Sequence, residues 1–247
     1  MNKIYLMYHD IYKNSPDESG FQNISAFQYK ISSSEFESHV KAIKEYCDSH
    51  VGIEVVFTFD DGGVSFLLHA APILEKYGYK GVFFISTKYI DTSLFLSTEQ
   101  LRELYDRGHI IGSHSHSHLE MSKLNDKEID EEWSKSLKVL SEYSQHEFIA
   151  SIPNGDTRNY VECSAAKHKI NKLYTSTPTI EIIQKNGIDL IGRYVVYKGM
   201  TKDDVLKIVS SSFYRNKLYT KYLILRMVRI ILGKYYNNLK SLIFGNR

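Results

Sequence analysis

Short apolar runs alternate along the chain with longer segments that have an amphipathic pattern. Residues 125–143 place Ile129, Trp133, Leu137 and Leu140 on one face of a predicted helix. Strands that alternate with helices indicate a parallel sheet, either open or closed into a barrel. The apolar runs predict seven buried strands, at residues 4–8, 54–59, 81–86, 109–113, 148–152, 172–176 and 190–196.

Capping patterns mark where the helices between these strands begin. A serine or asparagine stands three residues before a glutamate or glutamine at Ser34, Ser97 and Asn125, which predicts helix starts there. Residues 13–33 are polar and lack a clear period, so we expect a long loop with a functional role. The chain contains no G-x-G-x-x-G after the first strand and no Walker A sequence, which argues against a nucleotide-binding open sheet.

Polar residues follow four of the predicted strands. In parallel α/β folds, ligands bind at the carboxyl ends of the strands. Side chains delivered to one edge by four separate strands therefore predict a functional site at that edge. These residues are His9 and Asp10, Asp60 and Asp61, His114, His116 and His118, and Pro153, Asn154 and Gly155.

Two adjacent carboxylates end the strand in "EVVFTFDDGG", residues 54–63. Two like charges at a buried strand end are costly unless a cation, a metal ion or a shared proton offsets them. His114 and His118 are four residues apart, and in a helical turn both rings would lie on one side with His116 pointing away. An extended segment would instead pair His114 with His116, and a solvated histidine-rich turn would bind nothing.

The carboxylate pair and the histidines together favour a metal site. Imidazole and carboxylate form an ordinary ligand set for a divalent ion, with zinc expected first and cobalt, nickel or manganese as alternatives. One aspartate would bind the metal and the other would lie beside a metal-bound water. Metal binding lowers the pKa of that water from near 16 to about 7, so the free carboxylate could take its proton. This chemistry is typical of hydrolysis of a carbonyl compound.

Three stretches make the chain resemble the polysaccharide deacetylases, also called carbohydrate esterase family 4 or NodB-homology enzymes. "TFDDG" (58–62) is similar to their first motif, "HSHSH" (114–118) to their second and, more weakly, "SIPNG" (151–155) to their third. The resemblance covers about residues 3–210 and implies a distorted (β/α)7 barrel, assigned to residues 1–212. It also implies metal ligands Asp61, His114 and His118, a general base at Asp60, and removal of acetyl groups from N-acetylated sugars.

The chain departs from the family pattern at its third and late motifs. Ser151 stands where the family has an arginine that orients the catalytic aspartate, and we expect Arg193 to do so from another strand. The late motif that supplies a histidine general acid has no match. "MYHDI" (7–11) is similar to relatives with permuted motifs, so we assign the general acid to His9. Substrate contacts are expected from Tyr8, Asp10, Pro153, Asn154 and Gly155, with the oxyanion held near Asn154.

Other functions remain compatible with the same residues. The site could serve an O-acetyl esterase or another amide hydrolase, since one metal-water mechanism covers all of them. A non-catalytic carbohydrate-binding protein of the same fold is a further alternative. A net charge of +2 gives no strong field toward nucleic acid, so no nucleic-acid partner is expected. Cys47 and Cys163 are far apart and are expected to be free thiols.

Residues 213–247 form a basic tail that carries eight lysines and arginines and no acidic residue. The tail predicts a cationic amphipathic helix, which either packs on the barrel or makes a peripheral contact with an anionic membrane surface. The N-terminus lacks the apolar stretch of a signal peptide and no run is long enough to span a bilayer, so we expect a cytoplasmic protein. An N-acetylated lipid-linked glycan on the inner leaflet would then fit as substrate.

Overall fold

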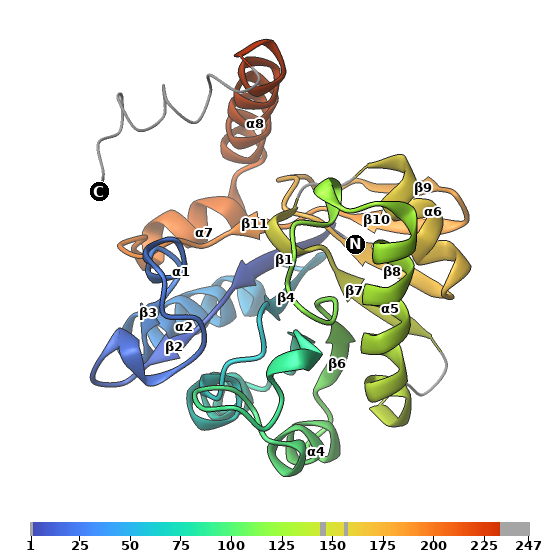
Figure 1. The fold of residues 1–247 in the computed structure, drawn as a ribbon. Coiled ribbons are helices and arrows are strands. Elements are labelled where there is room, and N and C mark those ends of the chain that lie inside the picture. The colour runs from blue at the N-terminus through green and yellow to red at the C-terminus, as the bar shows by residue number, and fades with distance from the viewer. Residues whose placement is uncertain (1, 144–146, 156–157, 233–247) are drawn as a thin grey trace.

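The computed structural model describes residues 2–143, 147–155 and 158–232. Nine strands in this part of the chain form one curled sheet, with helices packed around it (Figure 1). Neighbouring strands are parallel except β9, which runs antiparallel to β10 at one edge. The spatial order is β11 (Tyr194–Val195), β1 (Asn2–Tyr8), β4 (Ile53–Phe59), β5 (Gly81–Ile85), β6 (Ile110–Ser113), β7 (Phe148–Ser151), β8 (Ile170–Tyr174), β10 (Ile188–Ile191) and β9 (Ile182–Lys185).

The predicted seventh strand is split in two, and the two parts pair on opposite sides of the sheet. β10 pairs with β8, and β11 pairs with β1 on the opposite side. Only Gly192 and Arg193 separate β10 from β11. Position 192 must be glycine, because a Cβ atom there would lie 2.4 Å from the carbonyl oxygen of Thr177. The segment therefore links the β1 side of the sheet to the β8 side, and the fold is the distorted barrel that the family resemblance implied.

Helices follow most strands and bury their apolar faces. The helix predicted at 125–143 is α5 (Asp126–Leu140), and Ile129, Trp133, Leu137 and Leu140 are all buried. α2 packs on α7, and α5 packs on α6. The remaining helices are α1 (Ile24–Phe27), α2 (Ser33–Ser49), α3 (Ala71–Lys76), α4 (Thr98–Asp106), α6 (Asn159–Lys167), α7 (Lys202–Ser210) and α8 (Ser212–Leu232).

Local structure differs from the sequence prediction in two places. Residues 13–33 are not one long loop, because they contain a 3-10 turn at Pro16–Glu18, helix α1 and the short strand β3 (Ile31–Ser32), which pairs with β2 (Ile11–Tyr12). The capping box predicted at Ser34 lies two residues earlier, at Ser32 and Glu35.

The basic tail begins as α8, whose first residue is Ser212, and residues 233–247 of the tail lie outside the described part. Among the described helices, none combines the length and the apolar character needed to cross a bilayer. Cys47 and Cys163 are free, as predicted.

Candidate metal centre and active site

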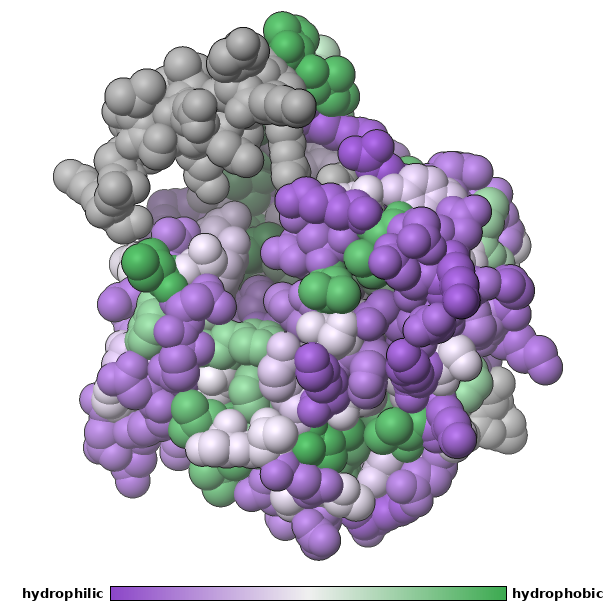
Figure 2. Space-filling view, viewed as in Figure 1, coloured by the Kyte–Doolittle hydropathy of each residue, from purple (hydrophilic) through white to green (hydrophobic). Residues whose placement is uncertain are grey.

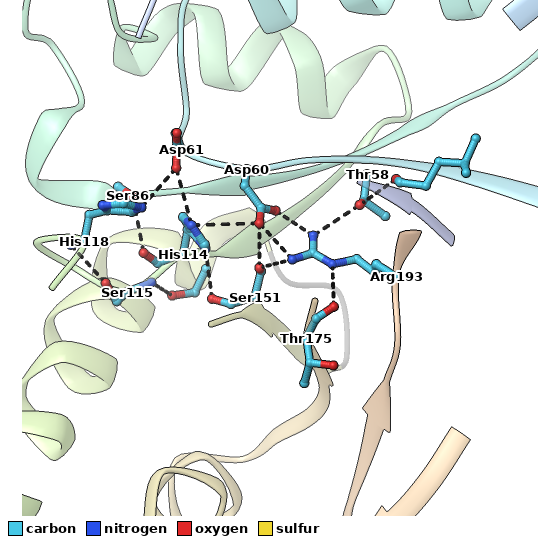
Figure 3. Close-up of polar contacts among 12 residues, drawn as sticks. Thr58, Asp60, Asp61, Ser86, His114, Ser115, His118, Ser151, Thr175 and Arg193 are labelled. Atoms are coloured by element: carbon cyan, nitrogen blue, oxygen red, sulfur yellow. Dashed lines mark hydrogen bonds and ion pairs between the residues drawn. The ribbon is translucent and has the colours of Figure 1, made fainter. Parts of the chain in front are cut away.

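Asp60 and Asp61 lie directly after β4, at its carboxyl end. The Asp60 amide donates to the carbonyl of Tyr8 on the neighbouring strand at 3.1 Å, so pairing continues to the end of β1. Asp61 then takes a φ of 93°, a conformation that L residues rarely adopt. This reversal sends the two adjacent side chains to different neighbours (Figure 3). The two residues are only 3% and 5% exposed, so each charge needs its own compensation.

Arg193 compensates Asp60 with a two-pronged ion pair. Its Nη1 lies 2.6 Å from Asp60 Oδ1 and its Nη2 lies 2.8 Å from Oδ2. Ser151 donates its hydroxyl to Asp60 Oδ2 at 3.0 Å and accepts from Arg193 Nη2 at 2.6 Å. Burial opposes the charge on Asp60, but the guanidinium outweighs it and holds the pKa of this carboxyl below its ordinary value.

The rest of the guanidinium is also fixed. Arg193 is fully buried, its Nε donates to the carbonyl oxygen of Thr175, and its Nη1 donates to the hydroxyl of Thr58 (Figure 3). The planar fork is thus held on both sides in one orientation. Asp60 is left ionised and aligned, with an oxygen 3.9 Å from His114 Nε2.

Asp61 faces two imidazoles instead of a guanidinium. Its Oδ1 lies 3.4 Å from His114 Nε2 and 3.1 Å from His118 Nε2. One candidate ligand atom from each of the three residues lies within 4.8 Å of the others. Burial works against the charge of Asp61, while imidazoles that carry a proton toward it would hold the pKa of this carboxyl well below its usual range.

The chemistry of this donor set fits a divalent cation. His114 Nδ1 lies 3.0 Å from the carbonyl oxygen of Ser151, which can only accept, so Nδ1 carries a proton and, in the neutral ring, Nε2 carries the lone pair. That lone pair points toward Asp61 Oδ1, which is buried and has no properly aligned hydrogen-bond donor. Lone pairs that converge without a proton between them repel one another unless a cation lies among them. Asp61, His114 and His118 could therefore hold a metal ion.

The histidine segment is an irregular loop, not the helical turn that the sequence analysis considered. The His114 amide still pairs with the carbonyl of Ile85, so the loop continues the edge of β6 beside β5. Ser115 and His118 then take φ values of 62° and 61°, which bring His118 back toward Asp61. His116 points away, with Nδ1 3.0 Å from the hydroxyl of Thr87. The expected ring placement is thus reached by two left-handed residues.

His9 lies beside this centre with an unused nitrogen. Its Nδ1 is buried and has no hydrogen-bond partner among the described residues. Its ring stacks on Tyr29 at 4.6 Å between centroids, and Tyr29 in turn contacts Tyr197 at 5.4 Å. Burial lowers the pKa of His9, although the nearby charges of Asp61 and Asp60 oppose that shift.

Comparison with known proteins places the chain in a family. The family model for polysaccharide deacetylase matches residues 34–173, more than half of the chain. The chain belongs to the polysaccharide deacetylase family. A chitin deacetylase of Arthroderma benhamiae is 32% identical over 87 residues, and the protein YxkH of Bacillus subtilis is 35% identical over 102. These matches take in 35% and 41% of this chain but only 23% and 37% of those two proteins.

Solved structures of deacetylases share the fold along most of the chain. The Streptococcus pyogenes deacetylase PplD has a TM-score of 0.69 and 21% identity, and the match covers 85% of this chain and 99% of PplD. IcaB from Ammonifex degensii has a TM-score of 0.67 and 19% identity, with 85% and 96% covered. The barrel is therefore the deacetylase fold.

Two residues predicted to contact substrate have other contacts in this member of the family. Tyr8 is fully buried, stacks on Phe59, and places its hydroxyl 3.4 Å from His39 Nδ1. Asp10 is 2% exposed, and its carboxylate accepts from the hydroxyls of Ser19 and Ser65 at 2.7 and 3.0 Å. The motif pattern placed both at a strand end, but neither offers a polar atom to a ligand.

The third-motif residues form a sharp turn after β7. Pro153 is buried, while Asn154 is exposed with a φ of 60° and Gly155 follows with a φ of 65°. A Cβ atom on Gly155 would lie 1.4 Å from the hydroxyl oxygen of Ser176, and this clash together with the positive φ favours glycine here. The turn presents Asn154 to solvent at the same edge as Ser151, and its role toward substrate stays a prediction.

Glu132 of α5 is a site residue that the sequence analysis missed. Its carboxylate accepts from the amides of His116 and Ser117 at 2.9 and 2.7 Å and from the Ser117 hydroxyl at 2.6 Å. Glu132 is only 8% exposed, and it fixes the loop that runs from His114 to His118. A glutamate in a charged helical stretch gives no sign of this, beyond its place one residue before the buried Trp133.

We predict that Glu132→Gln weakens zinc binding about 10- to 100-fold, the usual effect of losing a group that orients metal ligands. The measurement is a competition titration of the protein against a zinc chelator. The control is Glu131→Gln, because Glu131 pairs with Lys135 on the exposed side of the same helix and should leave affinity unchanged. Equal zinc affinity in Glu132→Gln and the wild type would contradict the assignment.

Proposed function

We propose that this protein is a metal-dependent N-deacetylase that acts on an N-acetylated sugar of a polysaccharide or glycan precursor. The main support for the proposal is that two adjacent buried aspartates have different partners. Asp61 faces His114 and His118, while Asp60 is held separately by Arg193. Family membership supports the reaction class. The neighbouring rings of Tyr29 and Tyr197 beside His9 support a sugar ligand, because aromatic faces pack well on sugar rings.

The metal would be held by Asp61, His114 and His118, with zinc as the first expectation. A divalent ion at this position would act as a Lewis acid on the acetyl carbonyl and would make a water more acidic. His114 is already in the tautomer that such an ion requires, since its Nδ1 proton is committed to Ser151. Three protein ligands leave room for water and a substrate oxygen.

The chain's own residues would move the protons. Asp60, kept ionised by Arg193, would accept a proton from the water that adds to the acetyl carbon. His9 would donate a proton to the sugar nitrogen as the carbon–nitrogen bond breaks, which releases acetate and a free amine. A lowered pKa makes protonated His9 a stronger acid, although a smaller share of it is protonated at neutral pH. Arg193 and Ser151 would keep the Asp60 carboxylate in line.

Acetate release from N-acetylglucosamine oligomers by the zinc-loaded protein tests the proposed activity and the assignment of His9 as the general acid. We expect His9→Ala to lower kcat about 10²- to 10⁴-fold, the usual contribution of a general acid, with zinc content unchanged. His50→Ala is the matched control, because His50 is exposed at the end of α2. Wild-type kcat in His9→Ala would refute the acid assignment.

The same assay separates the alternative functions. Acetate release from O-acetylated sugars but not from N-acetylated ones would favour an esterase. Stoichiometric zinc with no acetate from either kind of substrate would favour a carbohydrate-binding protein.

Arg193→Ala should lower kcat about 10²-fold by releasing Asp60 from its fixed orientation. It should also cost about 3–5 kcal/mol of stability, because a buried charge loses its partner. Arg193→Lys restores the charge without the fork, so we expect it to recover part of the stability but little of kcat. The measurements are steady-state kinetics and urea unfolding at equal zinc content. Unchanged turnover in Arg193→Ala would show that Arg193 does not orient the base.

A further inference from the structure

Helix α8 leaves the barrel and exposes a row of apolar side chains. Phe213, Ile224, Met227, Ile230 and Ile231 are 51–81% exposed. In Figure 1 the helix projects from the body of the molecule, and Figure 2 shows apolar residues at its described end, at the top of the view. Large exposed apolar side chains grouped on one element mark an interaction surface.

The N-terminal part of α8 already packs on the barrel. Tyr214 and Leu218 pack against the main core cluster. Arg215 is buried and donates to the carbonyl oxygens of Ile208 and Val209 at 2.8 and 2.9 Å. The first two turns of α8 are therefore anchored to the barrel, and most of the exposed apolar side chains, from Ile224 to Ile231, lie beyond these turns.

The charges of the helix are all of one sign. α8 contains five basic residues and no acidic residue. Three of these, Lys217, Lys221 and Arg226, are exposed and have no carboxylate within ion-pair distance in the part of the chain that the structure describes. Beyond α8, the sequence adds three more basic residues and no acidic one. A basic helix with exposed apolar side chains has the chemistry that an anionic lipid surface attracts.

We propose that α8 binds the surface of an anionic lipid bilayer and holds the barrel there. The apolar side chains would enter the boundary between headgroups and acyl chains, and the lysines would meet the lipid phosphates. The helix would lie in the interface, because it is not apolar enough to cross the bilayer.

The helix also contacts the edge of the barrel that carries the site. The hydroxyl of Tyr222 lies 3.3 Å from that of Thr177, which follows β8 at its carboxyl end. The carbonyl of Thr177 accepts from the amide of Arg193 at 2.9 Å. A bilayer bound to α8 would thus lie near the edge of the barrel that carries Asp60 and Asp61. This placement favours a glycan carried on a lipid as substrate, a consequence that rests on the proposed deacetylase function.

Vesicle co-sedimentation of the full chain tests the helix directly. The vesicles are neutral phosphatidylcholine, or the same lipid with 30% phosphatidylglycerol, an amount chosen on the order of natural anionic membranes. We expect binding to the anionic vesicles only, and at least a tenfold loss in Lys217→Glu/Lys221→Glu, given about fivefold for each basic residue removed. Ile224→Asn/Ile231→Asn should also weaken binding, with the charge unchanged.

The control is Lys127→Glu/Lys138→Glu, which makes the same change in net charge on the exposed face of α5. This variant should bind anionic vesicles like the wild type. Equal loss of vesicle binding in both lysine pairs, or equal binding of the wild type to both kinds of vesicle, would overturn the proposal.

Sedimentation velocity tests whether the helix instead binds a second copy of the chain. If the Ile224 and Ile231 changes abolish a dimer but leave vesicle binding intact, the helix is a dimer contact and the proposal is wrong. Acetate release from soluble oligomers is measured in parallel, so loss of membrane binding is distinguished from loss of the deacetylase itself.

Discussion

Two adjacent carboxylates buried at the end of one strand are the constraint on which the rest of this structure depends. Asp60 and Asp61 follow β4 directly, and the backbone turns at Asp61, so each aspartate has its own main partner. Asp60 is neutralised by the fork of Arg193, and Asp61 is left to the two imidazoles of His114 and His118. The cost of burying like charges side by side is thus offset at Asp60 by a permanent cation, and at Asp61 it would be offset by the metal ion that we propose.

Closure of the barrel makes this division possible. Arg193 lies in the two-residue break between β10 and β11, where the chain passes from one end of the sheet to the other. From that break its side chain reaches Asp60 across the barrel, and Ser151 at the end of β7 completes the contact. An arginine in the third motif would approach from β7 itself. In this protein Ser151 is small enough to let Arg193 occupy that space.

The sequence predicted the parts of the structure that have a local pattern. The buried strands, the apolar face of α5 and the two aspartates at the end of β4 follow from period and position alone. The split of residues 190–196 could not be predicted, because the two halves pair with strands far apart in the chain. The placement of Tyr8 also depends on contacts across the sheet, since strand alternation does not tell whether a face lies in a core or a cleft. Glu132 acts on a loop 15 residues away, and no local signal marks it.

The most direct test of this account is zinc binding by the two aspartate variants, measured by equilibrium dialysis on protein shown to be folded. We predict one tightly held zinc per chain in the wild type and in Asp60→Asn, and loss of that zinc in Asp61→Asn. Loss of zinc in Asp60→Asn, or wild-type zinc affinity in Asp61→Asn, would contradict the separate roles assigned to these two side chains.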